Sequence, residues 1–522
     1  MFALFANIFA GGFVLDDHFL IERNPRAHSL AGVGLAFTTD VQRFQSGAAA
    51  PPAYYRPLTL ASYVVDYALW GSRPGPFHLA NLIAHALAAV LAALLFMRLF
   101  ASVWTAAAAA ALWAAHPIAS ESVAWISGRT DAFATCGVLG ALIAWLRWRE
   151  VGGHRWLALA ALVTYAACLA KESAALTPLM ALAVEPLARA SRGQQGRRLG
   201  LGLAVLGAAV LATIVQRVAV IGAFSHAEWA GGGRAAAARI ALRAWTYYAR
   251  SLVWPRALVS DIFARPPAWG DWAVIAGGLI AIAALAALAV AWRRRARAAV
   301  PLALAVLAML PVAGVIVALP TPVALRYLYL PAFGAAALLV LAIEAPLARV
   351  RPWLPAAAAL ALVAALAPLT LARNREYRDD ATLYRAIIRH ADEAGLGVEP
   401  GYSTLLDYAG IIVKERRLDE AEALTRRAIA EVPGAIPGWL NLGFVLAWKN
   451  EGGQAIAAWT QAARLDPESP DPPFDIALQP DKSGRREEAL RRCHAALDKG
   501  LPPPRRDATL QRIRELESGA AR

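Results

Sequence analysis

The chain has 522 residues, of which 58% are hydrophobic and 17% are charged, and its formal net charge is +14. Soluble proteins contain about 45–50% apolar and about 25% charged residues. The composition therefore excludes a collagen, a disordered tail and a small disulfide scaffold, and it argues strongly against a wholly soluble enzyme. The cysteines Cys136, Cys168 and Cys493 are too widely spaced to predict a disulfide framework or a zinc site.

The net excess of positive charge lies in the apolar part of the chain. Residues 373–522 carry 23 basic and 24 acidic side chains, whereas residues 1–372 carry 29 basic and 14 acidic ones. This distribution favours arginines that flank membrane spans over a basic surface for nucleic acid, so we expect no nucleic-acid partner.

Residues 1–372 predict an all-α, polytopic membrane domain with about eleven spans, because they contain eleven apolar blocks that are long enough, or nearly so, to cross a hydrocarbon core of ~30 Å. In chain order the blocks are Met1–Leu15, Asn81–Leu99, Val103–Ala115, Asp131–Leu146, Trp156–Ala170, Ala174–Leu187, Leu199–Gln216, Asp271–Trp292, Ala299–Leu319, Leu328–Leu347 and Trp353–Ala372. The first block lacks the basic segment and the small-residue cleavage site of a signal peptide, so we interpret it as a short span.

Arginines gather in alternate loops of this domain. If the N-terminus is cytoplasmic, the loops around residues 98, 147–155, 189–198, 293–297 and 349–351 all lie inside, as the positive-inside rule requires. An odd number of spans then places the C-terminal region on the extracytoplasmic side, together with loops 11–80, 116–130, 171–173, 217–270 and 320–327. The richness in Ala and Arg suits a bacterial origin, for which we expect an inner-membrane protein with a periplasmic C-terminal region.

A repeat of 34 residues is found beyond Arg373. Its equivalent positions hold Ala421, Ala455 and Ala489, then Ala428, Ala462 and Ala496, and also Pro433 and Pro467. The middle unit, with Trp439, Gly443 and Trp459, resembles a tetratricopeptide repeat, a helix–turn–helix unit that stacks into an α-solenoid.

The neighbouring units match less well. The first has Leu405, Tyr408 and Ala409 at corresponding places, and the third has Pro473 and Pro480 where a regular helix cannot form. We expect a connecting amphipathic helix in residues 373–400, two to three repeat units in 401–501, and a C-terminal helix or tail in 502–522.

The first long loop, residues 11–80, contains the most informative acidic pair. Asp16 and Asp17 directly follow the first apolar block, where an ionised side chain is costly and usually functional. Partial burial and repulsion between the two carboxylates would raise the pKa of one of them and make it a usable general base. Alternatively, the pair marks the point where the chain leaves the membrane, or caps the next helix.

A series of motifs accompanies this pair in a fixed order. The series comprises Asp16-Asp17-His18, Asn24-Pro25, Tyr55-Arg56-Pro57-Leu58-Thr59, Asp66-Tyr67-Ala68-Leu69-Trp70-Gly71, Phe77-His78-Leu79-Ala80-Asn81, Trp113-Ala114-Ala115-His116-Pro117, Glu121-Ser122-Val123-Ala124-Trp125-Ile126-Ser127-Gly128-Arg129, Lys171-Glu172-Ser173, Trp254-Pro255 and Arg326-Tyr327-Leu328-Tyr329-Leu330-Pro331. With the appended repeats, this series resembles the transmembrane and tetratricopeptide-repeat O-mannosyltransferases, which are glycosyltransferases of the C fold.

The resemblance implies an enzyme that transfers a sugar, mannose or similar, from a polyprenyl-phosphate donor to a hydroxyl of an extracytoplasmic protein. It implies a general base at Asp16 or Asp17. Residues suited to hold the lipid phosphate are Arg129, Lys171, Arg326 and Tyr327. Residues suited to orient the sugar or the acceptor are His116, Glu121, Asp131, Glu172 and Arg56. We expect no metal and no cofactor beyond the lipid-linked donor, with the repeats docking the protein acceptor.

Several of these residues have structural alternatives. Lys171 and Glu172 are also typical of an interfacial pair whose lysine reaches the lipid headgroups. Arg129 and Asp131 are suited to a local salt bridge, and Arg326 and its neighbouring tyrosines to an aromatic belt. Two other functions remain open: the same chemistry on a glycan or lipid acceptor, and a non-enzymatic membrane scaffold.

Overall fold

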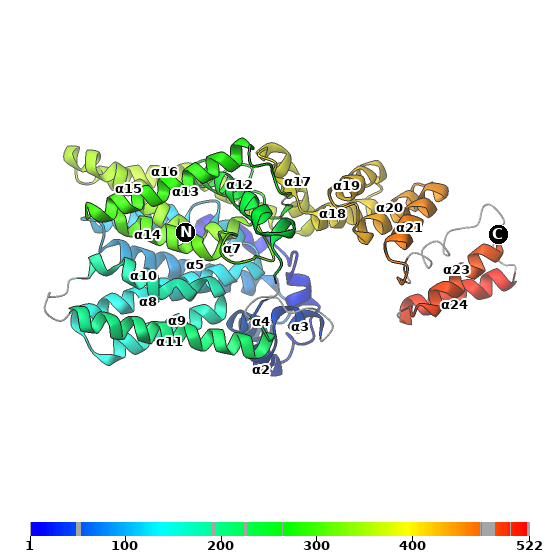
Figure 1. Cartoon of the computed structure of the whole chain (residues 1–522), viewed down its shortest axis with the longest axis horizontal. Coiled ribbons are helices and arrows are strands. Elements are labelled where there is room, and N and C mark those ends of the chain that lie inside the picture. Colours follow the sequence, from blue (N-terminus) through cyan, green and yellow to red (C-terminus); the bar gives the residue numbers. More distant parts are fainter. Residues whose placement is uncertain are drawn as a thin grey trace. The chain divides into compact units, whose positions relative to one another are not determined.

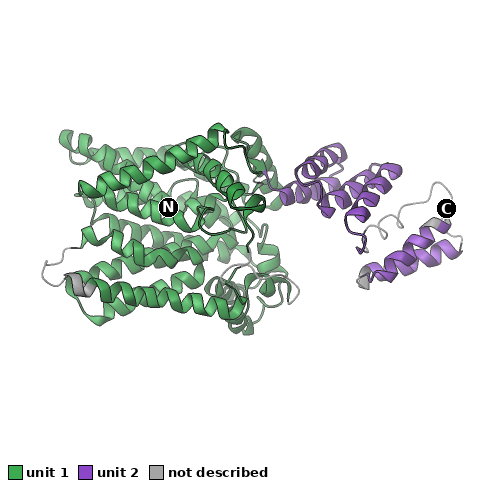
Figure 2. Ribbon diagram, viewed as in Figure 1, with its two compact units in different colours: residues 1–399 green, residues 400–522 purple. Residues whose placement is uncertain are grey.

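The protein is an all-α, polytopic membrane protein. The computed structural model describes residues 2–47, 54–188, 195–223, 227–263, 265–469, 471, 486–501 and 503–518, and most of them are helical (Figure 1). The chain forms two compact units, Met1–Glu399 and Pro400–Arg522 (Figure 2).

The first unit contains seventeen α-helices in its described residues. They are α1 (Phe2–Phe5), α2 (Ala31–Thr38), α3 (Val41–Ser46), α4 (Pro57–Trp70), α5 (Pro74–Phe96), α6 (Val103–Ala114), α7 (Ala119–Val123), α8 (Arg129–Val151), α9 (His154–Ala170), α10 (Thr177–Ala183), α11 (Gln195–Ile221), α12 (Arg234–Val253), α13 (Trp272–Arg293), α14 (Ala299–Met309), α15 (Pro331–Val350), α16 (Leu354–Glu376) and α17 (Asp380–Ala394). The strands, β1 (Ile262–Phe263) and β2 (Glu399–Pro400), are only two residues long.

Five helices among the described residues are long and apolar enough to cross a membrane: α5, α11, α13, α15 and α16. Helices α6, α9 and α14 are apolar but shorter. On α13, Leu279 and Ile282 are 61% and 65% exposed. Such exposure of large apolar side chains is what a lipid-facing helix requires, because lipid tails are as apolar as the side chains.

Three of the eleven predicted blocks are not continuous α-helices. In Ala174–Leu187, α10 covers only Thr177–Ala183, between two 3₁₀ turns. In Met1–Leu15, α1 passes into a 3₁₀ turn that ends at Ala10, and in Ala299–Leu319 the helical conformation ends at Val312. Pro311 interrupts the hydrogen bonding of the last of these blocks, and Gly314 has a left-handed backbone with φ +71°. The number of spans therefore remains a prediction.

Loops that the arginine pattern assigned to one side contact one another. Ion pairs join Arg56 to Glu172 at 2.6 Å, Lys171 to Asp131 at 2.5 Å and Arg326 to Glu121 at 2.9 Å. A second set joins the arginine-rich loops: Arg98 pairs with Glu150, and Arg297 donates to the Leu99 carbonyl at 3.0 Å. Each of these contacts joins segments that the arginine pattern assigned to the same side.

The second unit contains paired helices α18 (Tyr402–Lys414) and α19 (Leu418–Glu431), then α20 (Ile436–Trp448) and α21 (Gly452–Leu465), followed by α23 (Arg486–Asp498) and α24 (Pro503–Ser518). The repeat alanines Ala421, Ala428, Ala455 and Ala462 are fully buried. A Cβ added at Gly443 would lie 2.2 Å from Trp459 Nε1, so α20 and α21 cross closely at this glycine. These contacts suit a 34-residue helical repeat, whose family assignment stays a prediction; Pro473 and Pro480 lie outside the described residues.

Small residues also set the helix crossings of the first unit. A Cβ at Gly277 on α13 would lie 1.8 Å from the Leu242 carbonyl oxygen on α12, whereas a Cβ at the adjacent Gly278 would meet nothing within 4 Å. The α12–α13 crossing therefore requires a hydrogen atom at position 277, as is common where helices pack closely in membranes.

We predict that Gly277→Ala destabilises the protein by about 1–3 kcal/mol because the added methyl group forces the two helices apart. The measurement is the melting temperature of the full chain in detergent. Gly278→Ala is the matched control and leaves the melting temperature unchanged. Equal effects of the two substitutions would contradict this account of the crossing.

Candidate active site

The adjacent acids Asp16 and Asp17 occupy opposite environments. Asp17 is fully buried, and its carboxylate accepts hydrogen bonds from the backbone N–H of Val14 at 3.1 Å and of Ser127 at 2.8 Å, and from the Ser127 hydroxyl. Asp16 is exposed, and its side chain accepts no hydrogen bond from the part of the chain that the structure describes. Asp17 thus ties the first loop to the segment before α8, while Asp16 is open to a substrate.

Burial raises the pKa of Asp17 to about 7, against the hydrogen bonds from Ser127 and Val14, which lower it. Because this pKa is higher in the folded than in the unfolded chain, the stability that Asp17 contributes is fully present at low pH. That stability is lost as the pH rises through about 7. Because its side chain is buried and its oxygens accept hydrogen bonds from Val14 and Ser127, Asp17 has a structural role and is not an accessible base.

Asp16 is surrounded by charges from three other segments. Partial removal from water raises its pKa, Arg326 and Arg56 lower it, and the like charge of Asp261 raises it. The net effect is a pKa above the ordinary value of an aspartate. An exposed carboxylate with a raised pKa and cations nearby has the properties of a general base.

The Arg326 guanidinium lies over two aromatic rings and pairs with a buried acid. Its Nη1 donates to Glu121 Oε1 at 2.9 Å, and its Cζ lies 5.4 Å from the Trp125 ring centroid and 5.6 Å from that of Tyr327. Burial raises the pKa of Glu121, although Arg326 opposes the shift. Glu121 fixes one guanidinium nitrogen and leaves other N–H groups for an anion.

Lys171 and Arg56 are held in the same way. Lys171 is buried; its Nζ donates to Asp131 Oδ1 at 2.5 Å and lies 5.3 Å from the Tyr327 ring centroid. Burial lowers the pKa of Lys171, and Asp131 opposes the shift. Arg56 forms a two-bond pair with Glu172, at 3.1 and 2.6 Å. Partial removal from water raises the pKa of the Glu172 carboxyl, but Arg56 outweighs this effect and the pKa is lowered to about 2.

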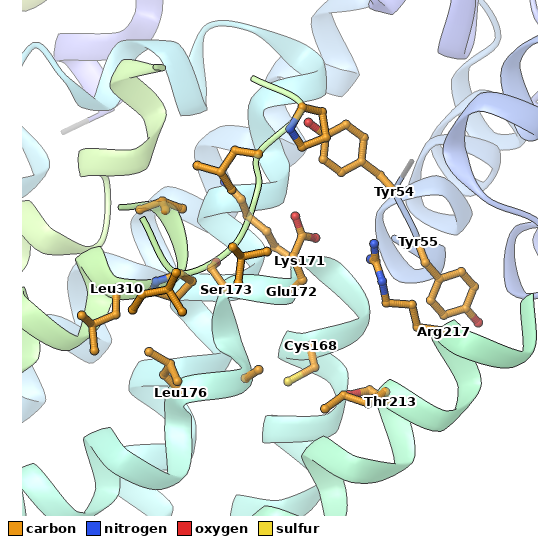
Figure 3. Close-up of a pocket in the computed structure, with 18 of the residues that line it drawn as sticks. Tyr54, Tyr55, Cys168, Lys171, Glu172, Ser173, Leu176, Thr213, Arg217 and Leu310 are labelled. Atoms are coloured by element: carbon orange, nitrogen blue, oxygen red, sulfur yellow. The ribbon is translucent and has the colours of Figure 1, made fainter. Parts of the chain in front are cut away.

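A cavity of about 310 Å³ lies next to these pairs. Its polar residues include Lys171, Glu172, Arg217 and Tyr327, and its apolar wall is formed largely by residues 310–312 and 316–320. Figure 3 shows Lys171, Glu172 and Arg217 near one another, with Leu176 and Leu310 lining another part of the wall. A cavity that combines cations with an apolar wall matches the chemistry of a phosphate linked to a hydrocarbon chain.

Arg129 lies inside the protein and not at the cavity. It is fully buried, and it donates to Asp66 at 2.5 Å, to Ser62 Oγ at 3.0 Å, to Asn81 Oδ1 at 2.8 Å and to the Phe77 carbonyl at 3.1 Å. A guanidinium with this many protein acceptors serves structure, so we leave Arg129 out of the donor site proposed below. Its ion pair is with Asp66 and not with Asp131, contrary to the alternative of a local pair.

His116 lies in a turn where both ring nitrogens are engaged by backbone. Its Nδ1 accepts from the Ile118 N–H at 3.3 Å, and its Nε2 donates to the Leu252 carbonyl at 3.2 Å. This pattern favours a structural role for His116 over contact with a sugar. Tyr327 is buried, and its hydroxyl donates to the Thr321 carbonyl at 2.7 Å. Its ring faces Lys171 and Arg326.

Three residues at the site were missed in the sequence. Arg217 lines the cavity, Tyr54 lies beneath the Arg56 guanidinium at 4.3 Å, and Asp261 acts on Asp16. Arg217 had a readable signal, since it directly follows the apolar block that ends at Gln216, as Lys171 follows the block that ends at Ala170. Tyr54 and Asp261 carried no signal, because only the fold brings them to the site.

Several curated proteins are similar to this chain, although no protein-family model matches it. It is 35% identical over 237 residues to the protein O-mannosyl-transferase Tmtc2 of Drosophila melanogaster, which covers 44% of this chain and 25% of the relative. It is 29% identical over 176 residues to Tmtc1 of the same species (33% of this chain, 20% of the relative). It is also 27% identical over 136 residues to human TMTC3 (26% of this chain, 15% of the relative).

These similarities confirm the resemblance that the motif series indicated. The chain spans no more than about a quarter of the length of these relatives. The matches therefore support a likeness in sequence, and the activity of the chain is a matter of proposal.

Proposed function

We propose that this chain is a membrane glycosyltransferase that transfers a sugar, mannose by likeness to its relatives, from a polyprenyl-phosphate carrier to a hydroxyl of an extracytoplasmic protein. The observation that carries the proposal is the position of Asp16, an exposed carboxylate within electrostatic range of Arg326 and Arg56. Those cations also act electrostatically on Lys171 at the cavity. The relatives are named protein O-mannosyl-transferases, which supports the sugar and the class of acceptor.

In the proposed reaction, the acceptor hydroxyl oxygen attacks the anomeric carbon of the sugar while Asp16 takes the hydroxyl proton. The bond between the anomeric carbon and the phosphate oxygen breaks, and the electron pair leaves with the polyprenyl phosphate. Negative charge grows on the leaving phosphate, so cations aimed at it lower the barrier. Arg326 and Lys171 are suited to this role because each retains N–H donors beyond its carboxylate partner.

The hydrocarbon chain of the donor would lie along the apolar wall of the cavity, with its phosphate toward Lys171 and Arg217. Arg56 and Glu172 are suited to orienting the sugar or the acceptor, because their two-bond pair is rigid and partly accessible. Glu121 and Asp131 act through the cations that they hold.

The proposal includes a sidedness. The N-terminus is cytoplasmic and the site faces the periplasm of a bacterial inner membrane, which is supported by the positive-inside pattern and by the separate contacts of the two sets of loops. The repeats of the second unit would then be periplasmic and would dock a protein acceptor. Phe444 and Trp448 on α20 are 40% and 45% exposed and offer apolar contact for such a partner.

We predict that Asp16→Asn lowers transfer by about 10²–10⁴-fold, because the amide cannot accept the hydroxyl proton. The assay is incubation of the full chain in detergent with a tritium-labelled polyprenyl-phosphate mannose and a secreted-protein fraction. Expression, membrane insertion and melting temperature stay unchanged, because Asp16 is exposed. Full activity of this variant would exclude Asp16 as the base. Label found only on lipid or glycan would show that the acceptor is not a protein. No transfer by the wild type would favour a non-enzymatic membrane scaffold.

The neighbouring variant separates the two aspartates. Asp17→Asn should lower the melting temperature, because an amide nitrogen would face N–H groups that now donate to a carboxylate.

The pH profile tests the same base. Only ionised Asp16 is active, so kcat/KM falls as the pH falls through its raised pKa, at a pH above the ordinary value of 3.8. Asp261→Asn removes a like charge, lowers the pKa of Asp16 and moves this acidic limb to lower pH. Loss of stability from Asp17 would not produce this acidic limb, because the contribution of Asp17 to stability is lost with rising rather than falling pH. A shift of the limb to higher pH in Asp261→Asn would contradict the assignment.

Arg217 tests the donor site. Arg217→Gln should raise the KM for the lipid donor about tenfold or more, because a charge-assisted contact to phosphate is lost. Thr213→Val is the matched control: it lines the same cavity one turn earlier on α11, and its hydroxyl already donates to the Val210 carbonyl at 2.7 Å. If Arg217→Gln leaves the donor KM unchanged, the donor phosphate does not bind at this end of the cavity.

A further inference from the structure

The segment that contains Asp16 lies against the turn between α16 and α17. The Gly12 N–H donates to the Arg378 carbonyl at 2.9 Å. A Cβ at Gly11 would lie 3.2 Å from the Tyr377 carbonyl oxygen, so the two backbones approach closely at this glycine. Residues more than 360 positions apart in the sequence therefore fix the course of the first loop.

Asp380, the first residue of α17, binds the chain on both sides of Asp16. Its Oδ1 accepts from the Leu15 backbone N–H at 2.9 Å, and its Oδ2 accepts from His18 Nε2 at 2.8 Å. Asp380 itself is a quarter exposed and carries no other role in the proposed reaction. One carboxylate thus spans the residue before and the residue two positions after the proposed base.

The backbone that Asp380 holds is strained. Leu15 has a left-handed φ of +53°, which is costly for a residue with a branched side chain and persists only where the surroundings enforce it. The bend at Leu15 directly precedes Asp16 and determines the direction in which the Asp16 side chain leaves the backbone. Loss of the Asp380 contact would let Leu15 relax and change that direction.

His18 completes the anchor. Its Nδ1 lies 2.6 Å from Glu22 Oε2, and its Nε2 faces Asp380, so both ring nitrogens donate to carboxylates and the imidazolium form is favoured. The charge of His18 links Glu22 in the first loop to Asp380 on α17.

We propose that Asp380 is a positioning residue that holds the Leu15–His18 backbone so that the Asp16 carboxylate meets the acceptor hydroxyl. This inference rests on the proposed function, in which Asp16 is the base. Asp380 touches neither sugar nor lipid in this scheme, so it acts on the rate of the chemical step and not on donor binding.

The test compares Asp380→Ala with the wild-type full chain in detergent, again with labelled polyprenyl-phosphate mannose. We expect kcat to fall about 100-fold, as a base displaced by about 1 Å would produce, with the donor KM unchanged. Asp380→Asn keeps an oxygen that accepts from the Leu15 N–H and restores part of kcat. Hydrogen–deuterium exchange provides a readout without substrate: the peptide containing residues 13–20 exchanges faster in Asp380→Ala.

Asp379→Ala is the matched control. Asp379 caps α17 by accepting from the Thr382 N–H at 2.8 Å, and within the described residues it forms no hydrogen bond with the first loop. Its removal weakens the same helix end but leaves exchange of residues 13–20 and kcat close to wild type.

The outcomes are distinct. Unchanged exchange of residues 13–20 in Asp380→Ala, or an equal loss of kcat in Asp379→Ala, would overturn the positioning role. If the wild type transfers no sugar from the labelled donor, the proposed function fails and the catalytic part of this inference fails with it. The exchange measurement still decides whether Asp380 anchors the loop.

Discussion

Charge pairing in a poorly solvated environment governs the candidate site. A buried cation without a partner is strongly destabilising, and three cations near the cavity each have a carboxylate partner. Glu121 supports Arg326, Asp131 supports Lys171, and Glu172 supports Arg56. The pairs keep the cations charged and hold their side chains in one direction. An unpaired lysine or arginine at a membrane surface would be flexible. Asp16 differs from these acids, because it faces cations without bonding to one and has a second acid nearby.

The division of labour between Asp16 and Asp17 follows from the same constraint. Asp17 is buried, where a carboxylate is tolerated only when its oxygens are satisfied, and Ser127 and the Val14 N–H satisfy them. These hydrogen bonds link the first loop to the chain before α8, and they leave Asp17 unable to act as a base toward a substrate. The link also holds Asp16 at the surface. Asp17 therefore anchors the segment, and Asp16 is the carboxylate that a substrate can reach.

The sequence predicted the helical class, the apolar blocks and the set of loops that meet at the site. Those features depend on composition and on alternation of apolar and basic segments, which can be read locally. It did not predict the interior position of Arg129, because membership of a motif does not say which way a side chain faces. Nor could it choose between Asp16 and Asp17, whose different environments depend on the contacts of Asp17 with Val14 and Ser127. The contact of Asp380 with Leu15 joins the two ends of the first unit and has no local signature.

Helix α11 serves both as a cavity wall and as an outer surface of the first unit. Thr213, Ile214 and Arg217 line the cavity, while Leu211 and Val215 are each 60% exposed on the same helix. Under the proposed function, a wall shared with the bilayer would make supply of the lipid-linked donor a two-dimensional process. The relevant quantity would then be the mole fraction of carrier lipid in the leaflet. The spent carrier would return by the same lateral path to be recharged without leaving the membrane.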